Sequence, residues 1–129
     1  MIKIEHIALY TGDLEATKDF FARYFDARAG ELYHNEKTGF KSYFLSFPQG
    51  GARLELMNIP GLAADTTPGT RLGYAHLAIS VGSEANVDSL TARLREDGYE
   101  VLSGPRRTGD GYYESCIAGP DGCLIEITV

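Results

Sequence analysis

Two histidines and two glutamates occupy matching places in the two halves of this chain. His6 opens the run HIAL, and His76 opens the run HLAI seventy residues later. Glu55 lies in ARLELMNI near the end of the first half, and Glu126 lies in CLIEITV near the end of the second. Neutral imidazole nitrogens and carboxylate oxygens are ligands for Zn, Ni, Co, Mn or Fe, and four of them on a six-coordinate ion leave adjacent positions for water or a chelating substrate. The pattern therefore indicates a divalent metal site.

A structural interpretation of the same four residues stands beside this one. The glutamates would then be exposed residues of edge strands, and the histidines would be hydrogen-bonded core groups. Two carboxylates that share a cleft without a cation raise a pKa and cost stability, which disfavours a purely structural role. The recurrence of all four residues at matched positions also favours metal binding.

Each half of the chain predicts the same order of elements, βαβββ. Alternating apolar residues predict a first strand over residues 2–10 and again over 75–81. Asp13 and Ser83 follow as natural N-caps of a helix. Three strands are expected after each helix, over residues 28–35, 40–47 and 52–58 in the first half and over 101–107, 112–118 and 123–129 in the second. We predict an α+β fold of two tandem βαβββ modules.

The modules are expected to cover residues 1–59 and 74–129, joined by a linker over 60–73 that is rich in Pro, Gly and Thr. Both helices carry an apolar stripe that should pack on a sheet. The stripes consist of Thr17, Phe20, Phe21, Tyr24 and Phe25 in the first helix and of Val87, Leu90 and Leu94 in the second.

Strand parity decides which way the candidate ligands point, because successive side chains face opposite sides of a strand. His6 alternates with Ile7, and Glu126 alternates with Ile125 and Ile127. In all four strands the bulkier aliphatic residues occupy one face, which a helix should cover, and the His or Glu residue lies on the other. If the two modules curl their sheets toward one another, the second face lines a shared cleft in which the four side chains converge.

Charge and composition exclude several classes of protein. The net charge of -6 and the absence of a basic run longer than Arg106-Arg107 disfavour nucleic acid as a partner. No apolar run reaches the roughly 18 residues of a membrane span, and no signal-peptide core is present, so we expect a cytoplasmic protein. Cys116 and Cys123 bracket the turn-like AGPDG and are interpreted as reduced packing residues. Phosphate-loop and dinucleotide motifs are absent.

Taken together, these residues resemble the vicinal oxygen chelate superfamily, the glyoxalase and bleomycin resistance fold. The resemblance spans almost the whole chain and includes GYAHLAIS and the final GPDGCLIEI. It implies a cup around a divalent metal, with His6, Glu55, His76 and Glu126 as its ligands. This set is more similar to bacterial glyoxalase I than to relatives with two histidines and one glutamate, such as extradiol dioxygenases and fosfomycin resistance enzymes. Methylmalonyl-CoA epimerases are also similar, but they usually carry Gln at the position of Glu55.

The resemblance implies an enzyme of the lactoylglutathione lyase type, with Zn or Ni as the metal. Such an enzyme isomerises or epimerises a small oxygenated substrate, because the metal stabilises the enediolate that forms when a C–H proton is lost. By analogy, Glu126 is the base, and Glu55 is a ligand and a second proton carrier. Two alternatives stay open: a module that sequesters a ligand without catalysis, as bleomycin resistance proteins do, and an Fe(II) enzyme of the dioxygenase type.

The sequence departs from the glutathione-using members of the family. Tyr10 stands where those enzymes usually carry Arg, and Asn58 within MNIPG stands near their Asn-Trp-Gly segment, although this chain has no Trp. The use of glutathione or another thiol is therefore left open. Arg53 could anchor an anionic substrate or neutralise an acidic cleft, and Arg106 belongs to a segment that could close on a substrate or be a solvated loop. The candidate substrate contacts are Tyr10, Arg53, Asn58, Arg106 and Tyr113.

Oligomeric state follows only from the resemblance. Small chains of this superfamily commonly form dimers, so we expect a homodimer that binds a small-molecule substrate. The predicted linker over residues 60–73 permits a metal cleft within one chain or one shared between two chains.

Overall fold

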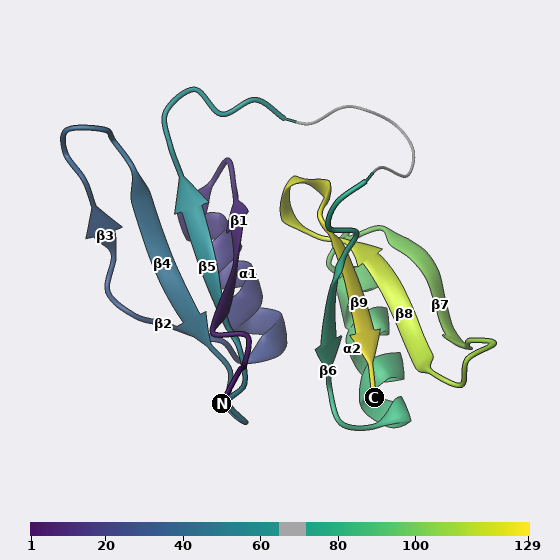
Figure 1. Ribbon diagram of the computed structural model, residues 1–129. Coiled ribbons are helices and arrows are strands. Elements are labelled where there is room, and N and C mark those ends of the chain that lie inside the picture. The colour runs from purple at the N-terminus through teal and green to yellow at the C-terminus, as the bar shows by residue number, and fades with distance from the viewer. Residues whose placement is uncertain (65–71) are drawn as a thin grey trace. The chain divides into compact units, whose positions relative to one another are not determined.

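The computed structural model describes residues 1–64 and 72–129, and it divides into two compact units, Met1–Asp65 and Thr66–Val129. Each unit contains its own β-sheet with one long helix against it (Figure 1). The predicted linker lies partly outside the described residues. Neither long helix has the length and apolar character needed to cross a bilayer, as far as the described residues are concerned.

The first unit is built around a mixed sheet. Its strand order is β1-β5-β4-β2, with β3 paired to β4, and β1 runs parallel to β5 whereas the other pairs are antiparallel. The elements are β1 (His6–Tyr10), α1 (Leu14–Phe25), β2 (Arg28–Ala29), β3 (Tyr33–His34), β4 (Lys41–Ser46) and β5 (Arg53–Asn58).

The second unit repeats this plan. Its strand order is β6-β9-β8-β7, with β6 parallel to β9, so the first strand of the unit again lies at the edge of the sheet and pairs with the last strand. The elements are β6 (Leu77–Ser80), α2 (Glu84–Glu96), β7 (Val101–Arg107), β8 (Tyr113–Ala118), a short 3-10 turn η1 (Pro120–Gly122) and β9 (Leu124–Thr128). The predicted α+β class with two βαβββ modules is confirmed.

The two long helices begin at the predicted caps. The Asp13 carboxylate accepts a hydrogen bond from the backbone N–H of Ala16 at 3.0 Å, and the Ser83 hydroxyl accepts one from Asn86 at 3.1 Å. Each cap satisfies a backbone donor that the first helical turn leaves unpaired. Helix α1 ends at Asp26, which adopts a left-handed conformation with φ 55°.

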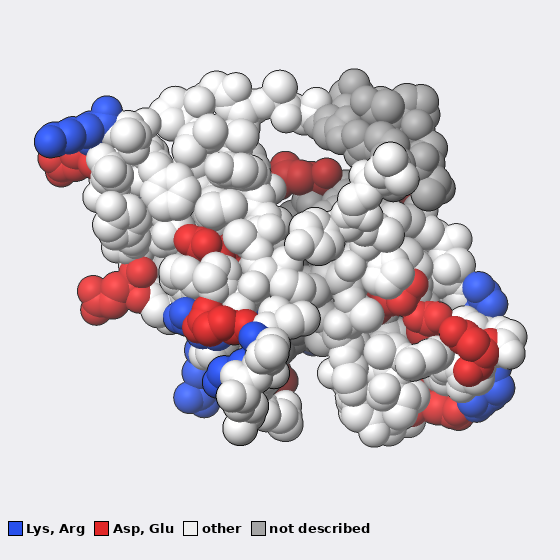
Figure 2. Space-filling view, in the orientation of Figure 1, with Lys and Arg blue, Asp and Glu red and all other residues white. Residues whose placement is uncertain are grey.

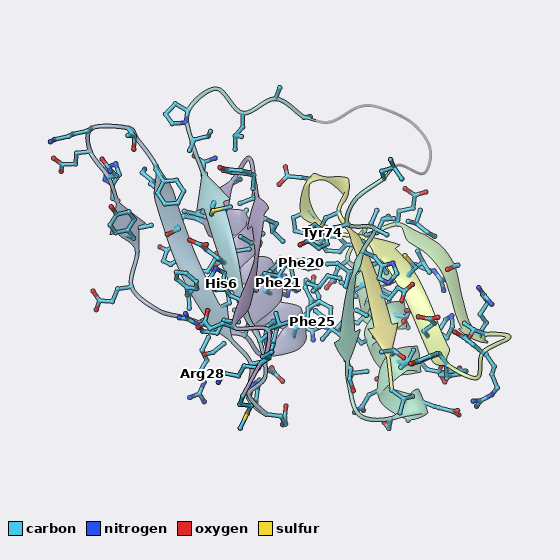
Figure 3. The ribbon with its side chains drawn as sticks, in the orientation of Figure 1. His6, Phe20, Phe21, Phe25, Arg28 and Tyr74 are labelled. Carbon is cyan, nitrogen blue, oxygen red and sulfur yellow. The ribbon has the colours of Figure 1, made fainter. Side chains whose placement is uncertain are left out.

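Each core lies between one face of the sheet and the apolar side of its helix. In Figure 3 the labelled Phe20, Phe21 and Phe25 come from α1, and all three are buried. The buried apolar strand residues of the same unit are Tyr43, Leu45, Leu54 and Leu56, and the second core contains Val87, Leu94, Ile117, Ile125 and Ile127. The aliphatic face predicted from strand parity is therefore the face that each helix covers.

The buried stripe of α2 differs from the predicted one at a single position. Leu90 is only partly buried, whereas the neighbouring Thr91 is fully buried. The Thr91 hydroxyl donates to the carbonyl of Val87 at 2.6 Å and is hydrogen-bonded to the Ser115 hydroxyl at 2.6 Å. Burial costs Thr91 little because its polar group is paired within the unit.

The strand predicted over residues 28–35 is wrong as a single element. It forms two short strands, β2 and β3, which both pair with β4. Ala29 pairs with Leu45 and Tyr33 pairs with Ser42, so residues 30–32 oppose only residues 43–44. One extra residue on one side of an antiparallel pair is a bulge, which interrupts the ladder.

Strand β1 begins at His6, four residues later than predicted. His6 pairs with Arg53, so the preceding residues would have to pair with the segment that contains Gly50 and Gly51. Both glycines have positive φ, 79° and 93°, in a turn that cannot continue a ladder. Residues 1–5 therefore precede the strand.

The core packing predicts a large difference between two leucines of the second unit. Leu94 is 0% exposed under the sheet, whereas Leu102 is 46% exposed on β7. We expect Leu94→Ala to lower the free energy of unfolding by about 2–5 kcal/mol, because it removes buried methyl groups and leaves a cavity. Leu102→Ala should change it by less than about 1 kcal/mol. Denaturant titration of both variants measures the difference, and equal losses would contradict this description of the core.

The thiol of Cys123 is expected to react slowly at neutral pH. Burial, with a smaller effect of the Asp121 charge, raises the pKa of the Cys123 thiol to about 11. Below a pH of about 8.5, which is the pKa of a thiol in the unfolded chain, the raised pKa contributes fully to the stability of the folded state. That contribution is lost as the pH rises from this value to about 11, the pKa in the folded state. Alkylation by iodoacetamide, followed by peptide mapping, should show Cys123 modification rising only at alkaline pH. Rapid modification at neutral pH would contradict the burial of this thiol.

Candidate functional site

The first His–Glu pair lies on the face of the first sheet that α1 does not cover. His6 opens β1, and Glu55 lies on the parallel neighbour β5, where it pairs with Ala8. Because His6 and Ala8 share a face, the histidine and Glu55 face the same side. His6 Nε2 lies 3.7 Å from Glu55 Oε1, with side-chain exposures of 39% and 15%. The predicted proximity of the two residues is thus present.

Phe44 of the antiparallel neighbour β4 packs against this pair. It stands opposite Glu55 in the register, and its ring meets the His6 imidazole edge to face, with centroids 5.2 Å apart and an interplanar angle of 89°. Such an arrangement places the positive edge of one ring on the electron-rich face of the other. Phe44 therefore limits the orientations open to the His6 ring.

The second His–Glu pair repeats the arrangement in the second unit. His76 immediately precedes β6, and Glu126 lies on the parallel strand β9 opposite Ala78. His76 Nε2 lies 3.2 Å from Glu126 Oε2, with side-chain exposures of 39% and 25%. Like the first pair, it lies opposite the helix-covered face.

The N···O separation of the second pair suits two ligands of one metal ion, and that of the first pair is slightly wider. Two donors that each lie about 2.1 Å from one ion are about 3.0 Å apart at a right angle and about 3.4 Å apart at the tetrahedral angle. The observed separations are 3.2 Å and 3.7 Å. Within residues 1–64 and 72–129, no cluster of three or more His, Cys, Asp or Glu side chains is close enough to hold a metal ion. Each unit by itself therefore offers two donors.

Glu114 joins the second pair, although the sequence analysis did not single it out. It lies on β8 with Cys116, and the register opposes Cys116 to Glu126. Burial, followed by a hydrogen bond with Glu126, raises the pKa of the Glu114 carboxyl. Burial and the charges of Glu126 and Glu114 also raise the pKa of the Cys116 thiol. The second pair is thus set in an acidic environment.

Glu5 joins the first pair, and it too was missed. Its carboxylate is hydrogen-bonded to His6 Nδ1 and to the guanidinium of Arg53. These two partners, His6 first, lower the pKa of the Glu5 carboxyl below its usual value. Figure 3 labels His6, the first residue of β1.

Three of the five candidate substrate contacts share a face with a His–Glu pair. Tyr10 shares the face of His6 and is 53% exposed, and Arg53 shares it too, with its guanidinium 4.2 Å from the centroid of the Phe44 ring. Arg106 stands opposite Glu114 in the register of β7 and β8, and therefore lies on the face of Glu126.

The other two candidate contacts lie on the helix-covered faces. The Asn58 amide donates to the carbonyl of Thr11 at 2.8 Å, and Asn58 helps to line a hollow at the start of α1. The Tyr113 hydroxyl donates to Asp88 of α2, which raises the pKa of the phenol. The described structure does not bring Asn58 or Tyr113 together with the glutamate of its unit.

Strand parity could have identified Glu114 but not Glu5. Glu114 and Cys116 have the same parity in an antiparallel neighbour of the Glu126 strand, so the sequence contained that information. Glu5 would point away from His6 if the strand included both residues. It reaches the His6 side chain because β1 begins only at His6.

The charged side chains do not form one broad basic surface in the view of Figure 2. On the displayed face, acidic and basic residues form small groups of both signs among larger uncoloured areas. The ion pairs of the described residues include Lys18 with Glu15 at 2.9 Å and Arg107 with Glu84. These exposed pairs contribute little to stability.

Nearly the whole chain matches one protein-family model. Residues 3–127 match the family model described as the Glyoxalase/Bleomycin resistance protein/Dioxygenase superfamily. The chain belongs to this superfamily. The match covers both units, including both His–Glu pairs, so the resemblance inferred from the sequence is confirmed.

Individual members of the superfamily differ considerably from this chain in sequence. Uncharacterized protein YqjT of Bacillus subtilis is 29% identical over 129 residues, which cover 96% of each protein. The trypanothione-dependent glyoxalase I of Leishmania major superposes with a TM-score of 0.77 at 21% identity, over 99% of this chain and 86% of that one. At such identity the likeness concerns the fold.

The fosfomycin resistance protein FosX of Listeria monocytogenes is a third relative. A structure of a FosX variant with Mn(II) and 1S,2S-dihydroxypropylphosphonic acid superposes with a TM-score of 0.75 at 25% identity, over 99% of this chain and 93% of that one. This chain is thus similar to a protein whose structure holds a divalent metal and an oxygenated small molecule.

Proposed function

We propose that this protein is a metal-dependent enzyme of the glyoxalase I type, which isomerises or epimerises a small oxygenated substrate. The observation that carries the proposal is the pair of matched His–Glu sites, with N···O separations of 3.7 Å and 3.2 Å on corresponding faces of the two sheets. Membership of the superfamily and the Mn(II) in the FosX structure support it.

The proposed ligands of one divalent ion are His6, Glu55, His76 and Glu126. Imidazole nitrogen and carboxylate oxygen suit borderline ions, among which we favour Zn or Ni. The carboxylates of Glu114 and Glu126 lie against each other in the second unit, and a cation offsets their repulsion. When bound, the ion polarises neighbouring substrate oxygens and lowers the barrier to loss of the adjacent C–H proton.

The chain's own residues then move the proton. In this proposal Glu126 accepts the proton from the substrate carbon and returns it to the neighbouring carbon, and the hydroxyl proton passes from one substrate oxygen to the other with Glu55 as its carrier. Glu114, hydrogen-bonded to Glu126, restricts the orientation of that carboxylate. Glu55 is the corresponding carboxylate of the first unit, where it completes the metal site and serves as a second proton carrier.

The environments of the two glutamates support giving the base role to Glu126. Glu55 packs beside Phe44 and is the less exposed of the two, at 15% against 25%. Glu126 faces Cys116 and lies beside Glu114. A base must leave the metal to take up a proton, and the more accessible carboxylate in the acidic environment is better suited to that role.

We expect the purified protein to bind about one divalent ion per chain after it is refilled with Zn or Ni. His6→Ala and His76→Ala should each weaken this binding by more than about 100-fold, beyond the 10- to 100-fold range typical for loss of a group that only hydrogen-bonds a ligand. Competition with a chromogenic chelator measures the affinities.

His34→Ala provides the matched control for these variants. His34 is an exposed histidine of β3 and belongs to neither pair. Its removal should leave the affinity unchanged. If the wild-type protein binds no divalent ion, or if all three histidine variants behave alike, the metal site is not as proposed.

The proton transfer predicts a specific defect in Glu126→Gln. Loss of the base should lower kcat for isomerisation of a 2-oxoaldehyde thiol adduct, or for epimerisation of an acyl thioester, by about 10²- to 10⁴-fold. Proton NMR in D2O follows the exchange at the reacting carbon directly. Glutathione and other thiols are tested separately as adduct partners.

Glu96→Gln is the control for the charge change, because Glu96 ends α2 and is exposed. It should retain the wild-type rate. A Glu126→Gln variant that keeps the wild-type exchange rate excludes Glu126 as the base. A metal-loaded wild-type protein that exchanges none of these substrates contradicts the glyoxalase-type reaction, and ligand sequestration then becomes the leading alternative.

A further inference from the structure

The side chain of Glu5 links His6 to Arg53. One carboxylate oxygen is hydrogen-bonded to His6 Nδ1, and the other accepts from Arg53 Nε at 2.8 Å and from a second guanidinium nitrogen. Because a guanidinium can only donate, the Glu5 carboxylate that it pairs with is a hydrogen-bond acceptor, and His6 Nδ1 is then the donor in its contact with Glu5. The remaining ring nitrogen, Nε2, is then the one with a free lone pair.

The backbone holds Glu5 in the position that this contact requires. The backbone N–H of Arg53 donates to the carbonyl of Glu5 at 2.9 Å, directly before the β1–β5 ladder begins with His6 opposite Arg53. Arg53 is held in turn by Phe44, which also packs on the His6 ring. Glu5, His6, Arg53 and Phe44 thus form one connected cluster, and His6 Nε2 emerges from it toward Glu55.

We propose that Glu5 is a positioning residue that keeps His6 in the Nδ1–H tautomer and presents its Nε2 to a metal ion. The inference rests on the proposed function, which supplies the metal ion that His6 Nε2 would bind. Metal-binding histidines commonly donate their other ring N–H to a carboxylate, which fixes the ring and makes it a better ligand. Arg53 contributes by orienting the Glu5 carboxylate, so its role is within the protein rather than in substrate binding.

The second unit lacks the chemical groups for such a cluster. By alignment of the two modules, Ala75 stands at the position of Glu5, and Leu124 stands at the position of Arg53. Neither hydrocarbon side chain can hydrogen-bond an imidazole. The two histidines should therefore differ in tautomer preference, and His76 provides an internal reference for His6.

The test compares the wild-type protein with Glu5→Ala in two measurements. Nitrogen-15 NMR of the metal-free protein, at a pH where imidazoles are neutral, reports which ring nitrogen carries the proton. We expect His6 to be protonated at Nδ1 in the wild-type protein and to gain Nε2–H population in Glu5→Ala, with His76 unchanged. Zn affinity should fall by about 10- to 100-fold in the same variant.

Two further variants separate positioning from a general loss of structure. Glu5→Gln retains a carbonyl oxygen that can accept from Nδ1, so it should recover most of the His6 tautomer preference. Glu31→Ala removes another exposed glutamate of the same unit and should change neither measurement. A His6 tautomer that is the same in wild type and Glu5→Ala overturns the inference, and so does a wild-type His6 protonated at Nε2.

The two proposals can fail separately in this experiment. The tautomer is measured without metal, so it tests the role of Glu5 on His6 even if the wild-type protein binds no Zn. Absence of Zn binding by the wild type contradicts the proposed function. Wild-type Zn binding with the same affinity in Glu5→Ala contradicts the positioning role alone.

Discussion

The alternation of side chains along parallel-paired strands is the constraint on which the rest of the structure depends. In the first unit β1 and β5 are paired so that His6 opposes Arg53 and Ala8 opposes Glu55. The His and Glu side chains must then share a face, while Leu54 and Leu56 turn to the face buried by α1. A slip of one residue would expose the leucines and bury the glutamate, so the hydrophobic core fixes the geometry of the polar pair.

The same backbone plan supports two different chemical environments. The strand next to Glu55 contributes Phe44, whereas the strand next to Glu126 contributes Cys116 and, two residues away, Glu114. The first pair is therefore bordered by an aromatic ring and the Glu5–Arg53 ion pair, and the second by an additional carboxylate. This asymmetry suits a division in which one half mainly holds an ion and the other also moves a proton.

The sequence was sufficient to predict the features that follow from periodicity. These features depend on local patterns that repeat from one module to the other. They are the helix caps at Asp13 and Ser83, the strand faces that the helices cover, and the uncovered face on which each His–Glu pair lies. The late start of β1 depends on a partner segment that turns at Gly50 and Gly51. Periodicity within β1 contains no information about that turn.

The contacts missed from the sequence are those that depend on where strands begin and how they pair. Asn58 was predicted beside a substrate because of its place after Glu55, but it alternates to the helix side and binds the Thr11 carbonyl. Strand parity would point Glu5 away from His6, but β1 begins only at His6, and the Glu5 carboxylate reaches both His6 and Arg53. Such positions require the strand pairing as well as the pattern.

X-ray absorption spectroscopy of the Zn- or Ni-loaded protein tests whether both histidines bind one metal ion, because multiple scattering from imidazole rings counts the histidines bound to the ion. We expect one ion per chain with two imidazole ligands and otherwise oxygen donors at about 2.0–2.2 Å. A bound ion with one imidazole or none, or with sulfur from a cysteine in its coordination shell, would contradict the proposal that the two matched His–Glu pairs hold a common metal.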